Sequence, residues 1–502
     1  MNQTRLRIRP QSYLLVYGFI AALLLLLHQP LLGVAFYWDE IGQFIPASLD
    51  LYQTASWIPH STLPNVHPPG VMVWLATFWH IFGFSIEATR IAMVLVAALA
   101  ATFTFLLAIE LGRGAPGAPA FTALSLLCVS PLFFSQAMLA QLDMPAMCCT
   151  LLALLLFLQN RFRASAIACI ALVLVKETGI VAPALFAAWL VCERRAKEAR
   201  WFAMPAAALV LWILVLKTGT GHWFGNRGFT DYNLFYPLHP LRLSVALLRR
   251  VYYLFLGGGH FIGTAVLLWA LRRMPLLKQR CWRISGAFVG LHFLTVSALG
   301  GAVLERYLLP ALPIVYIGFA TSFRALLPRP RKWAVAALFA CLVVGNFVNP
   351  IYPFPFENNL AFVTFVDLQK DAAAAIDLLP GSIATTFPMD NALQRPEYGY
   401  VFRGHKVVEL NGFLERDILP LRAHPPQMML VYDTAWDPLH LLDQPAVQSL
   451  LRQLYGYQRP MSPQEIGAVL SMREVKRWTR RGMWIELLVK DEKTKPLTLA
   501  SR

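Results

Sequence analysis

The chain has 502 residues, of which 57% are hydrophobic and 14% are charged, and its mean hydropathy is +0.52. These values exclude an ordinary soluble globular protein and predict an integral membrane protein. The formal net charge of +16 does not indicate a nucleic-acid partner, because the basic surplus is scattered through short loops between apolar segments, as the positive-inside bias predicts.

Two domains are predicted from where the apolar runs stop. Runs of membrane length recur up to residue 350, whereas residues 351–502 have mixed charges and carry 17 basic and 17 acidic residues. We therefore predict a polytopic α-helical membrane domain at 1–350 and a soluble α/β domain at 351–502. About eleven transmembrane helices are expected, near 12–32, 89–111, 118–138, 144–159, 164–177, 179–192, 201–217, 251–271, 284–300, 307–325 and 333–350.

The first loop, residues 33–88, is predicted to contain interfacial helices. Its apolar run at 68–83 would reach only about 24 Å as a helix, against a hydrocarbon core of about 30 Å. The N-terminus, basic and then apolar, is interpreted as an uncleaved first helix rather than a removable signal peptide.

Orientation follows from the basic clusters, which should lie on the cytoplasmic side. With the first loop outside, eight of the eleven acidic residues before 351 fall on the outer face, together with the domain at 351–502. One segment disagrees. Residues 218–250 would carry Arg227, Arg242, Arg249 and Arg250 to the outer face, so either a span is miscounted or these arginines form a surface for something anionic.

The second domain is expected to hold an amphipathic helix at 366–379, strands at 382–387, 405–410 and 427–432, and a final hairpin around Arg481 and Gly482. It contains no catalytic motif. We therefore expect it to cap the membrane domain or to help bind a substrate.

Five short stretches are placed on the outer face by this topology: WDE at 38–40, HPP at 67–69, QLDMP at 141–145, KETG at 176–179 and ERYLLPALP at 305–313. In this order they resemble the GT-C superfamily of membrane glycosyltransferases. The resemblance is to bacterial relatives of dolichyl-phosphate-mannose protein mannosyltransferase and of the lipid A aminoarabinose and galacturonosyl transferases.

The resemblance implies a GT-C fold and an inverting transfer of a single sugar from a polyprenyl-phosphate donor to an envelope acceptor, which is lipid A or core, another glycan, or a protein. It also implies a multi-pass protein of the bacterial inner membrane whose C-terminal domain is extracytoplasmic. The residues that match the family's pattern are Asp39 and Glu40 as the catalytic acidic pair, and Asp143, Lys176, Arg306 and Tyr307 as donor-phosphate or substrate contacts. Glu177 and His67, in the same outer stretches, are further candidate substrate contacts. The chain departs from the aminoarabinose transferases at His67, where a lysine is usual.

The same residue types suit the chemistry without the resemblance. An acceptor hydroxyl needs a positioned base, for which Asp39 is the candidate, and displacement assisted by one base would invert the anomeric centre. A phosphate leaving group needs cations rather than a second acid, and Lys176 and Arg306 can supply them. No cofactor is required, although a divalent metal held by Glu40, His67 and Asp143 is left open.

Other interpretations remain open at this point. Asp39 and Asp143 could be helix caps, Lys176 and Glu177 could form a locally paired turn, and His67 could be an ordinary loop histidine. A transporter or lipid flippase is the alternative function, since many spans and charges suit one.

Overall fold

The computed structural model describes residues 10–112, 119–433 and 436–491, and the chain divides into two compact units. The first consists of Met1–Leu32, Gln43–Asn349 and Glu357–Asn359. The second consists of Gly33–Gly42, Pro350–Phe356 and Leu360–Arg502. The segment around Asp39, which we expected in the first loop of the membrane domain, therefore packs with the second unit.

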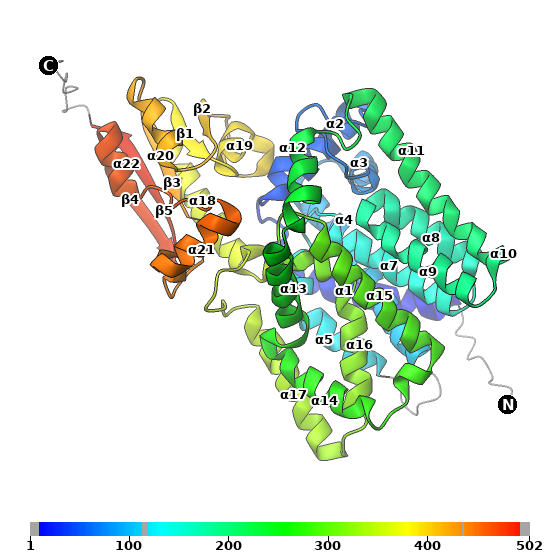
Figure 1. Ribbon diagram of the computed structural model, residues 1–502. Helices are drawn as coiled ribbons and strands as arrows, with labels where there is room; N and C mark the ends of the chain where they lie inside the picture. Colours follow the sequence, from blue (N-terminus) through cyan, green and yellow to red (C-terminus); the bar gives the residue numbers. More distant parts are fainter. Residues whose placement is uncertain (1–9, 113–118, 434–435, 492–502) are drawn as a thin grey trace. The chain divides into compact units, whose positions relative to one another are not determined.

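The first unit is helical (Figure 1). Its longer helices are α1 Pro10–His28, α2 Ile45–Thr54, α3 Gly70–Phe82, α4 Ile86–Leu111, α5 Ala120–Val129, α7 Asp143–Leu158, α8 Phe162–Val175, α9 Val181–Cys192, α11 Ala203–Thr220, α13 Pro240–Phe255, α14 His260–Leu271, α15 Arg280–Ala298, α16 Leu312–Phe323 and α17 Pro328–Gly345. Short helices α6 Pro131–Gln136, α10 Ala196–Ala199 and α12 Arg227–Thr230 join them.

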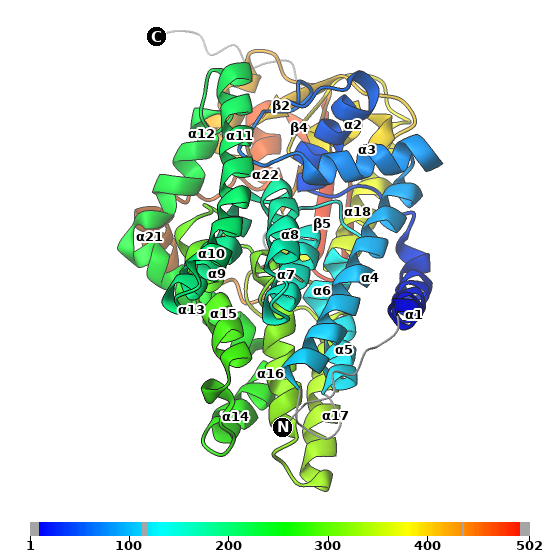
Figure 2. The same ribbon diagram turned by 90° about the vertical axis from the view of Figure 1, so that its right-hand side faces the viewer.

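Helix α4 packs against α1, α5 and α7, while α8 packs between α7 and α11 (Figure 2). The face that α4 buries is rich in alanine, including Ala92, Ala97, Ala98, Ala100 and Ala101. Small side chains let helix backbones approach closely, which is how helices associate without a hydrophobic gain from leaving water. The turn that carries Lys176 is thereby held at one end of this helical layer.

Among the described residues, three helices are long and apolar enough to cross a membrane: Ser12–Leu31, Ile86–Leu111 and Ala196–Thr220. A fourth span is counted if Pro240–Phe255 and Gly257–Leu271, which are bent by 41°, are taken together. The chain is an integral membrane protein, and the count of eleven spans stays a prediction.

Two predicted spans differ from the observed helices for identifiable reasons. The span at 118–138 is split into α5 and α6 because Pro131 holds Ser130 in an extended conformation. The span at 251–271 begins earlier, at Pro240, and is broken where Gly258 and Gly259 adopt positive φ angles. Glycine scores as nearly neutral in hydropathy, so the break was hidden from a count of apolar residues.

The loop between α2 and α3 is fixed by a buried carboxylate. Asp50 Oδ2 accepts hydrogen bonds from the backbone N–H groups of His60 and Ser61, at 2.8 and 2.9 Å. At the other end of the loop, Gly70 lies so close to the last turn of α8 that a Cβ would be 2.5 Å from the Leu174 carbonyl oxygen. The HPPG stretch is therefore pinned beside the turn that follows α8.

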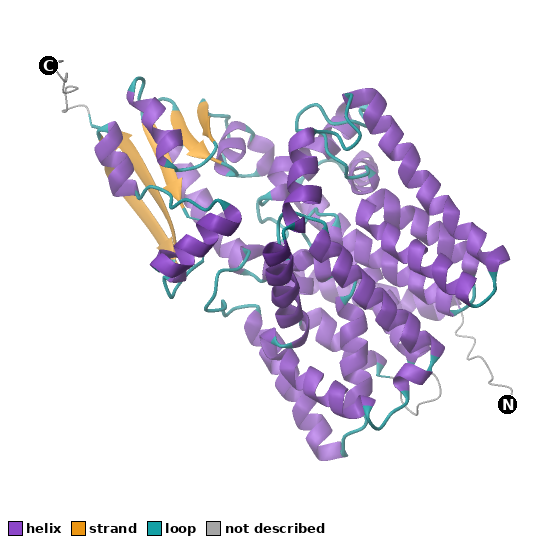
Figure 3. Ribbon diagram, viewed as in Figure 1, coloured by secondary structure: helices purple, strands orange, loops and turns teal. Residues whose placement is uncertain are grey.

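The second unit contains a five-stranded sheet of order β2-β1-β3-β5-β4 (Figure 3). Its strands are β1 Ile383–Thr386, β2 Val407–Leu410, β3 Met428–Tyr432, β4 Met472–Arg480 and β5 Met483–Lys490, and its helices are α18 Ala361–Ile376, α19 Met389–Gln394, α20 Glu415–Ile418, α21 Pro445–Tyr455 and α22 Pro463–Leu470. Strand β1 is parallel to β2 and β3, and β5 is antiparallel to β3 and β4. The strands and hairpin predicted from the sequence are thus confirmed.

Candidate functional site

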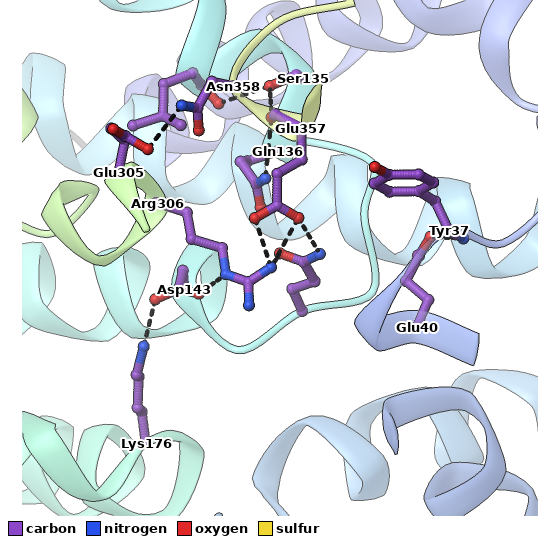
Figure 4. Close-up of polar contacts among 12 residues, drawn as sticks. Tyr37, Glu40, Ser135, Gln136, Asp143, Lys176, Glu305, Arg306, Glu357 and Asn358 are labelled. Atoms are coloured by element: carbon purple, nitrogen blue, oxygen red, sulfur yellow. Dashed lines mark hydrogen bonds and ion pairs between the residues drawn. The ribbon is translucent and has the colours of Figure 1, made fainter. Parts of the chain in front are cut away.

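Arg306 is the centre of a buried polar cluster in the first unit (Figure 4). Its Nη1 donates to Gln141 Oε1 and to both Glu357 carboxylate oxygens, each at 2.8 Å, and its Nε lies 3.2 Å from Asp143 Oδ2. Arg306, Asp143 and Glu357 are each 3% exposed. A guanidinium removed from water needs such partners, and Arg306 has them on both edges.

Lys176 reaches the same cluster from the turn after α8. It adopts an extended conformation, which ends the helix. Its Nζ lies 2.5 Å from Asp143 Oδ1 and 4.2 Å from the centroid of the Tyr307 ring. Asp143 therefore bridges two cations. The capping alternative for Asp143 does not match this arrangement, because the carboxylate begins α7 at a position after the N-cap, Leu142, and its oxygens are engaged by Lys176 and Arg306.

Glu177, the residue after Lys176, meets the HPPG loop. Its Oε2 lies 2.9 Å from His67 Nδ1, and both side chains are mostly buried. The imidazole ring also contacts the rings of Phe44 and Phe229. Two residues predicted to bind substrate thus form a carboxylate–imidazole pair that joins segments 110 residues apart.

A second pair of cations lies on α13, beside Tyr307. Arg249 Nε is 2.6 Å from Glu305 Oε1, and Asn358 donates to the other oxygen of Glu305 at 2.8 Å. The next residue, Arg250, is 1% exposed, and its Cζ lies 5.7 Å from the centroid of the Tyr307 ring.

Arg250 is unlike its neighbours because its charge has no counterpart. Its Nη1 is 3.5 Å from the Leu304 carbonyl oxygen, whereas its Nε and Nη2 have no hydrogen-bond partner within the described parts of the chain. It also makes no ion pair there, since the nearby carboxylates of Asp143, Glu305 and Glu357 are engaged by other side chains. The cluster of Lys176, Arg249, Arg250 and Arg306 with these three carboxylates carries one surplus positive charge.

Asp39 and Glu40 belong to a tight turn in the second unit. Glu40 is fully buried, and its Oε2 accepts the backbone N–H of Tyr37 at 2.9 Å, while its own N–H donates to the Tyr37 carbonyl at 3.0 Å. Trp38, directly before Asp39, has a φ of 49°, which is rare for a bulky residue and is stored strain of the kind found at functional positions. A π-helix, Glu40–Phe44, follows the turn.

No protein-family model and no curated protein sequence matches the chain. Solved structures do. ArnT from Cupriavidus metallidurans bound to undecaprenyl phosphate aligns with a TM-score of 0.55 and 13% identity over 95% of this chain and 98% of that one, and the apo state gives the same values. The Archaeoglobus fulgidus oligosaccharyltransferase in complex with zinc and sulfate aligns with a TM-score of 0.51 and 12% identity, over 94% and 72%.

This chain has the GT-C glycosyltransferase fold. The fold expected from the five short stretches is thereby confirmed. Within the GT-C fold of this chain, the first unit brings together Asp143, Lys176, Arg306 and Tyr307 in one cluster, and His67 with Glu177 in one pair.

Several residues of the cluster were missed by sequence reasoning. Gln141 stood inside a stretch that we singled out, and Glu305 began another, yet neither was assigned a role. Arg250 was named only as part of a basic segment that disagreed with the topology. Glu357 had no signal at all, because it lies in a short 3-10 helix, Phe356–Asn358, after α17 and reaches Arg306 only through the tertiary fold.

The residues left open as metal ligands do not fit a metal. Asp143 is engaged by two cations, Glu40 accepts a backbone N–H and His67 Nδ1 is paired with Glu177. Among the described residues, no group of three or more His, Cys, Asp or Glu side chains is arranged to hold an ion.

Proposed function

We propose that the protein is an inverting glycosyltransferase that moves one sugar, a hexose or pentose, from a polyprenyl-phosphate donor to an envelope acceptor at the outer face of the bacterial inner membrane. The observation that carries the proposal is Arg250. A buried guanidinium with two unpartnered nitrogens costs several kcal/mol unless an anion completes it. The anion that suits a GT-C fold is a lipid phosphate, and the ArnT structure solved with undecaprenyl phosphate supports this choice.

The cations around Tyr307 suit a departing phosphate. When the sugar–oxygen bond breaks, negative charge collects on the phosphate, which leaves without being protonated. Arg250 and Lys176 would stabilise that charge at a site already excluded from water, where such contacts are strongest. Arg306 would act indirectly, because its guanidinium is already paired with Glu357 and Asp143. Through the second pair, Arg306 would orient Asp143 toward Lys176.

The proton acceptor that we propose is Asp39, with Glu40 holding the turn on which Asp39 sits through its bond to the Tyr37 N–H. A positioned carboxylate takes the proton from the acceptor hydroxyl as the hydroxyl attacks the anomeric carbon from the side opposite the phosphate. A single displacement of this kind inverts the anomeric centre. The acceptor is a hydroxyl-bearing envelope molecule, which is lipid A or core, another glycan, or a protein.

Binding of undecaprenyl phosphate to purified protein in lipid nanodiscs tests the phosphate site. Arg250→Met should weaken binding, whereas Arg242→Met should not, although it removes an arginine from the same helix. Arg242 donates to the Tyr236 carbonyl and stacks on the Tyr236 ring, so it is held outside the cluster. Equal affinities for the wild type and both variants would refute the phosphate site.

Transfer is tested by offering the wild type a panel of undecaprenyl-phosphate sugars and measuring release of undecaprenyl phosphate. Consumption of one donor, with a product of inverted anomeric configuration, supports the proposal. A protein that binds the lipid phosphate and moves it across the bilayer without releasing sugar would instead be a flippase.

A further inference from the structure

The stretch that carries Asp39, Gly33–Gly42, belongs to the second unit, although the rest of that unit begins at Pro350. We call this stretch the Asp39 segment. It packs as part of the core of the unit, since Phe36 and Tyr37 are only 0% and 4% exposed. The proposed transfer uses no other residue of the second unit. The contacts that hold the Asp39 segment therefore indicate what the unit contributes to the reaction.

The start of the Asp39 segment is fixed through both backbone polar groups of Phe36. Its N–H donates to the Tyr398 carbonyl at 3.2 Å, and its carbonyl accepts the Tyr400 hydroxyl at 2.7 Å. Both tyrosines are themselves buried, at 0% and 6% exposed. A backbone group buried away from water is costly to leave unbonded, so these two hydrogen bonds set the position of Phe36 in the unit.

The turn around Asp39 lies against the ring of Phe387. The Trp38 ring packs edge-on against the Phe387 ring, with centroids 5.3 Å apart and an interplanar angle of 76°. On the other side of Asp39, a Cβ at Gly42 would lie only 2.7 Å from Phe387 Cε2. Both sides of the turn therefore contact one aromatic ring. Such close support accounts for the positive φ angle of Trp38, because a strained backbone persists only where its surroundings enforce it.

The sheet of the second unit fixes Phe387 in its turn. Phe387 directly follows β1, and β1 is an interior strand that pairs in parallel with both β2 and β3. A strand bonded on both edges has little freedom to shift, so the residue at its end is a firm support. The position of the Asp39 turn is thus set by the sheet through one ring, and by Tyr400 through the Phe36 carbonyl.

We propose that Phe387 and Tyr400 are positioning residues for Asp39, so that the second unit serves to aim the base. Neither would touch the reacting atoms, because both act through the backbone of the Asp39 segment. The carboxylate of an aspartate is one methylene away from its backbone, so its direction follows from the turn. A misplacement of about 1 Å can lower a rate by about 10²-fold. That Asp39 is the base rests on the proposed function, but the support of its turn by Phe387 does not.

Hydrogen exchange, measured by mass spectrometry on full-length protein in nanodiscs, tests the support directly. Phe387→Leu removes the ring and Gly42→Ala displaces it, and each should speed backbone exchange in residues 36–44 by about tenfold. Phe413→Leu is the matched control, because Phe413 is a buried aromatic residue of the same unit whose ring lies against Tyr432 instead of the Asp39 segment. It should leave exchange in residues 36–44 unchanged.

The effect on catalysis is measured with undecaprenyl-phosphate mannose, glucose and galacturonic acid as donors and lipid A as the acceptor. Phe387→Leu, and Tyr400→Phe, which removes only the hydroxyl bonded to Phe36, should lower kcat by up to about 10²-fold and leave the donor KM unchanged. In an Asp39→Asn background the same two substitutions should cause no further loss, because no base remains to be aimed. A purely structural role would lower kcat equally in both backgrounds.

Two results would overturn the inference. One is exchange in residues 36–44 that is no faster in Phe387→Leu than in Phe413→Leu. The other is an equal loss of kcat with and without Asp39. If exchange responds as expected but the wild type consumes none of the three donors, the result counts against the proposed function alone.

Discussion

Replacing Arg250 with methionine should lower affinity for undecaprenyl phosphate and at the same time raise the stability of the unliganded protein. The two effects have one cause. Arg250 is 1% exposed with two nitrogens unpartnered in the described structure, so its charge is buried at a cost of several kcal/mol without a direct ion pair to a described carboxylate. Methionine fills a similar volume without that charge.

The loss of affinity follows from the hydrogen bonds that Arg250 would give the phosphate. A hydrogen bond to a charged group contributes about 1.5 to 3 kcal/mol, which corresponds to about a 10- to 150-fold weaker dissociation constant. The gain in stability should appear as a higher unfolding temperature in detergent without ligand. Added undecaprenyl phosphate should raise that temperature in the wild type and much less in the variant, because a ligand stabilises only in proportion to its binding.

Arg306→Met is the variant to compare with Arg250→Met, because Arg306 is equally buried but is paired. Its guanidinium is paired with Asp143 and Glu357, so removal leaves two buried carboxylates short of a cation and should destabilise the protein by about 3 to 5 kcal/mol. The reasoning would be refuted if Arg250→Met lowered the unfolding temperature as far as Arg306→Met while leaving lipid-phosphate affinity unchanged. Arg250 would then be a structural residue.

Three further outcomes are expected. Asp39→Asn should keep donor binding and lose about 10²- to 10⁴-fold in transfer rate, measured as sugar transferred per enzyme per minute. An unchanged transfer rate would remove Asp39 as the base. Lys176→Met should weaken donor binding about tenfold and Lys176→Arg should restore part of it, whereas equal binding by both would show that charge at this position is irrelevant. Burial, with the charge of Glu474, raises the pKa of Glu486, so the folded state favours the neutral acid. Glu486→Gln should therefore raise the unfolding temperature at neutral pH, with the gain fading as pH falls toward about 4, and a gain that does not depend on pH would contradict this account.

Local pattern was enough to predict the second unit's strands. The run at 428–432, MMLVY, is buried at every position, and Arg481 and Gly482 both take the positive φ angles that the predicted hairpin turn requires. Hydropathy was less informative for the helices, because a proline after Ser130 and three consecutive glycines after Leu256 break apolar runs without making them polar.

The residues of the candidate site could be predicted only in part from the sequence, for a different reason. Sequence reasoning found Asp143, Lys176 and Arg306 because each sits in a charged stretch at the edge of an apolar segment. It could not separate Arg249 from Arg250, which are adjacent and chemically identical, since one is paired and the other unpaired only through the fold. Likewise, no motif near Glu357 in the sequence predicts its contact with Arg306.

The occupied carboxylates narrow the choice of base. An acid that removes a proton from a hydroxyl must have an oxygen available to it, and Asp143 has both oxygens engaged by Lys176 and Arg306. Glu177 is paired with His67, and Glu40 is fully buried and holds the Tyr37 N–H. The base that we propose, Asp39, is the acid that the family resemblance marks for this role, and it follows a strained residue, Trp38. Strain of about 1 to 3 kcal/mol persists only where the surrounding structure enforces it, and a turn held in this way would fix the direction of the Asp39 carboxylate, as the proposed role requires.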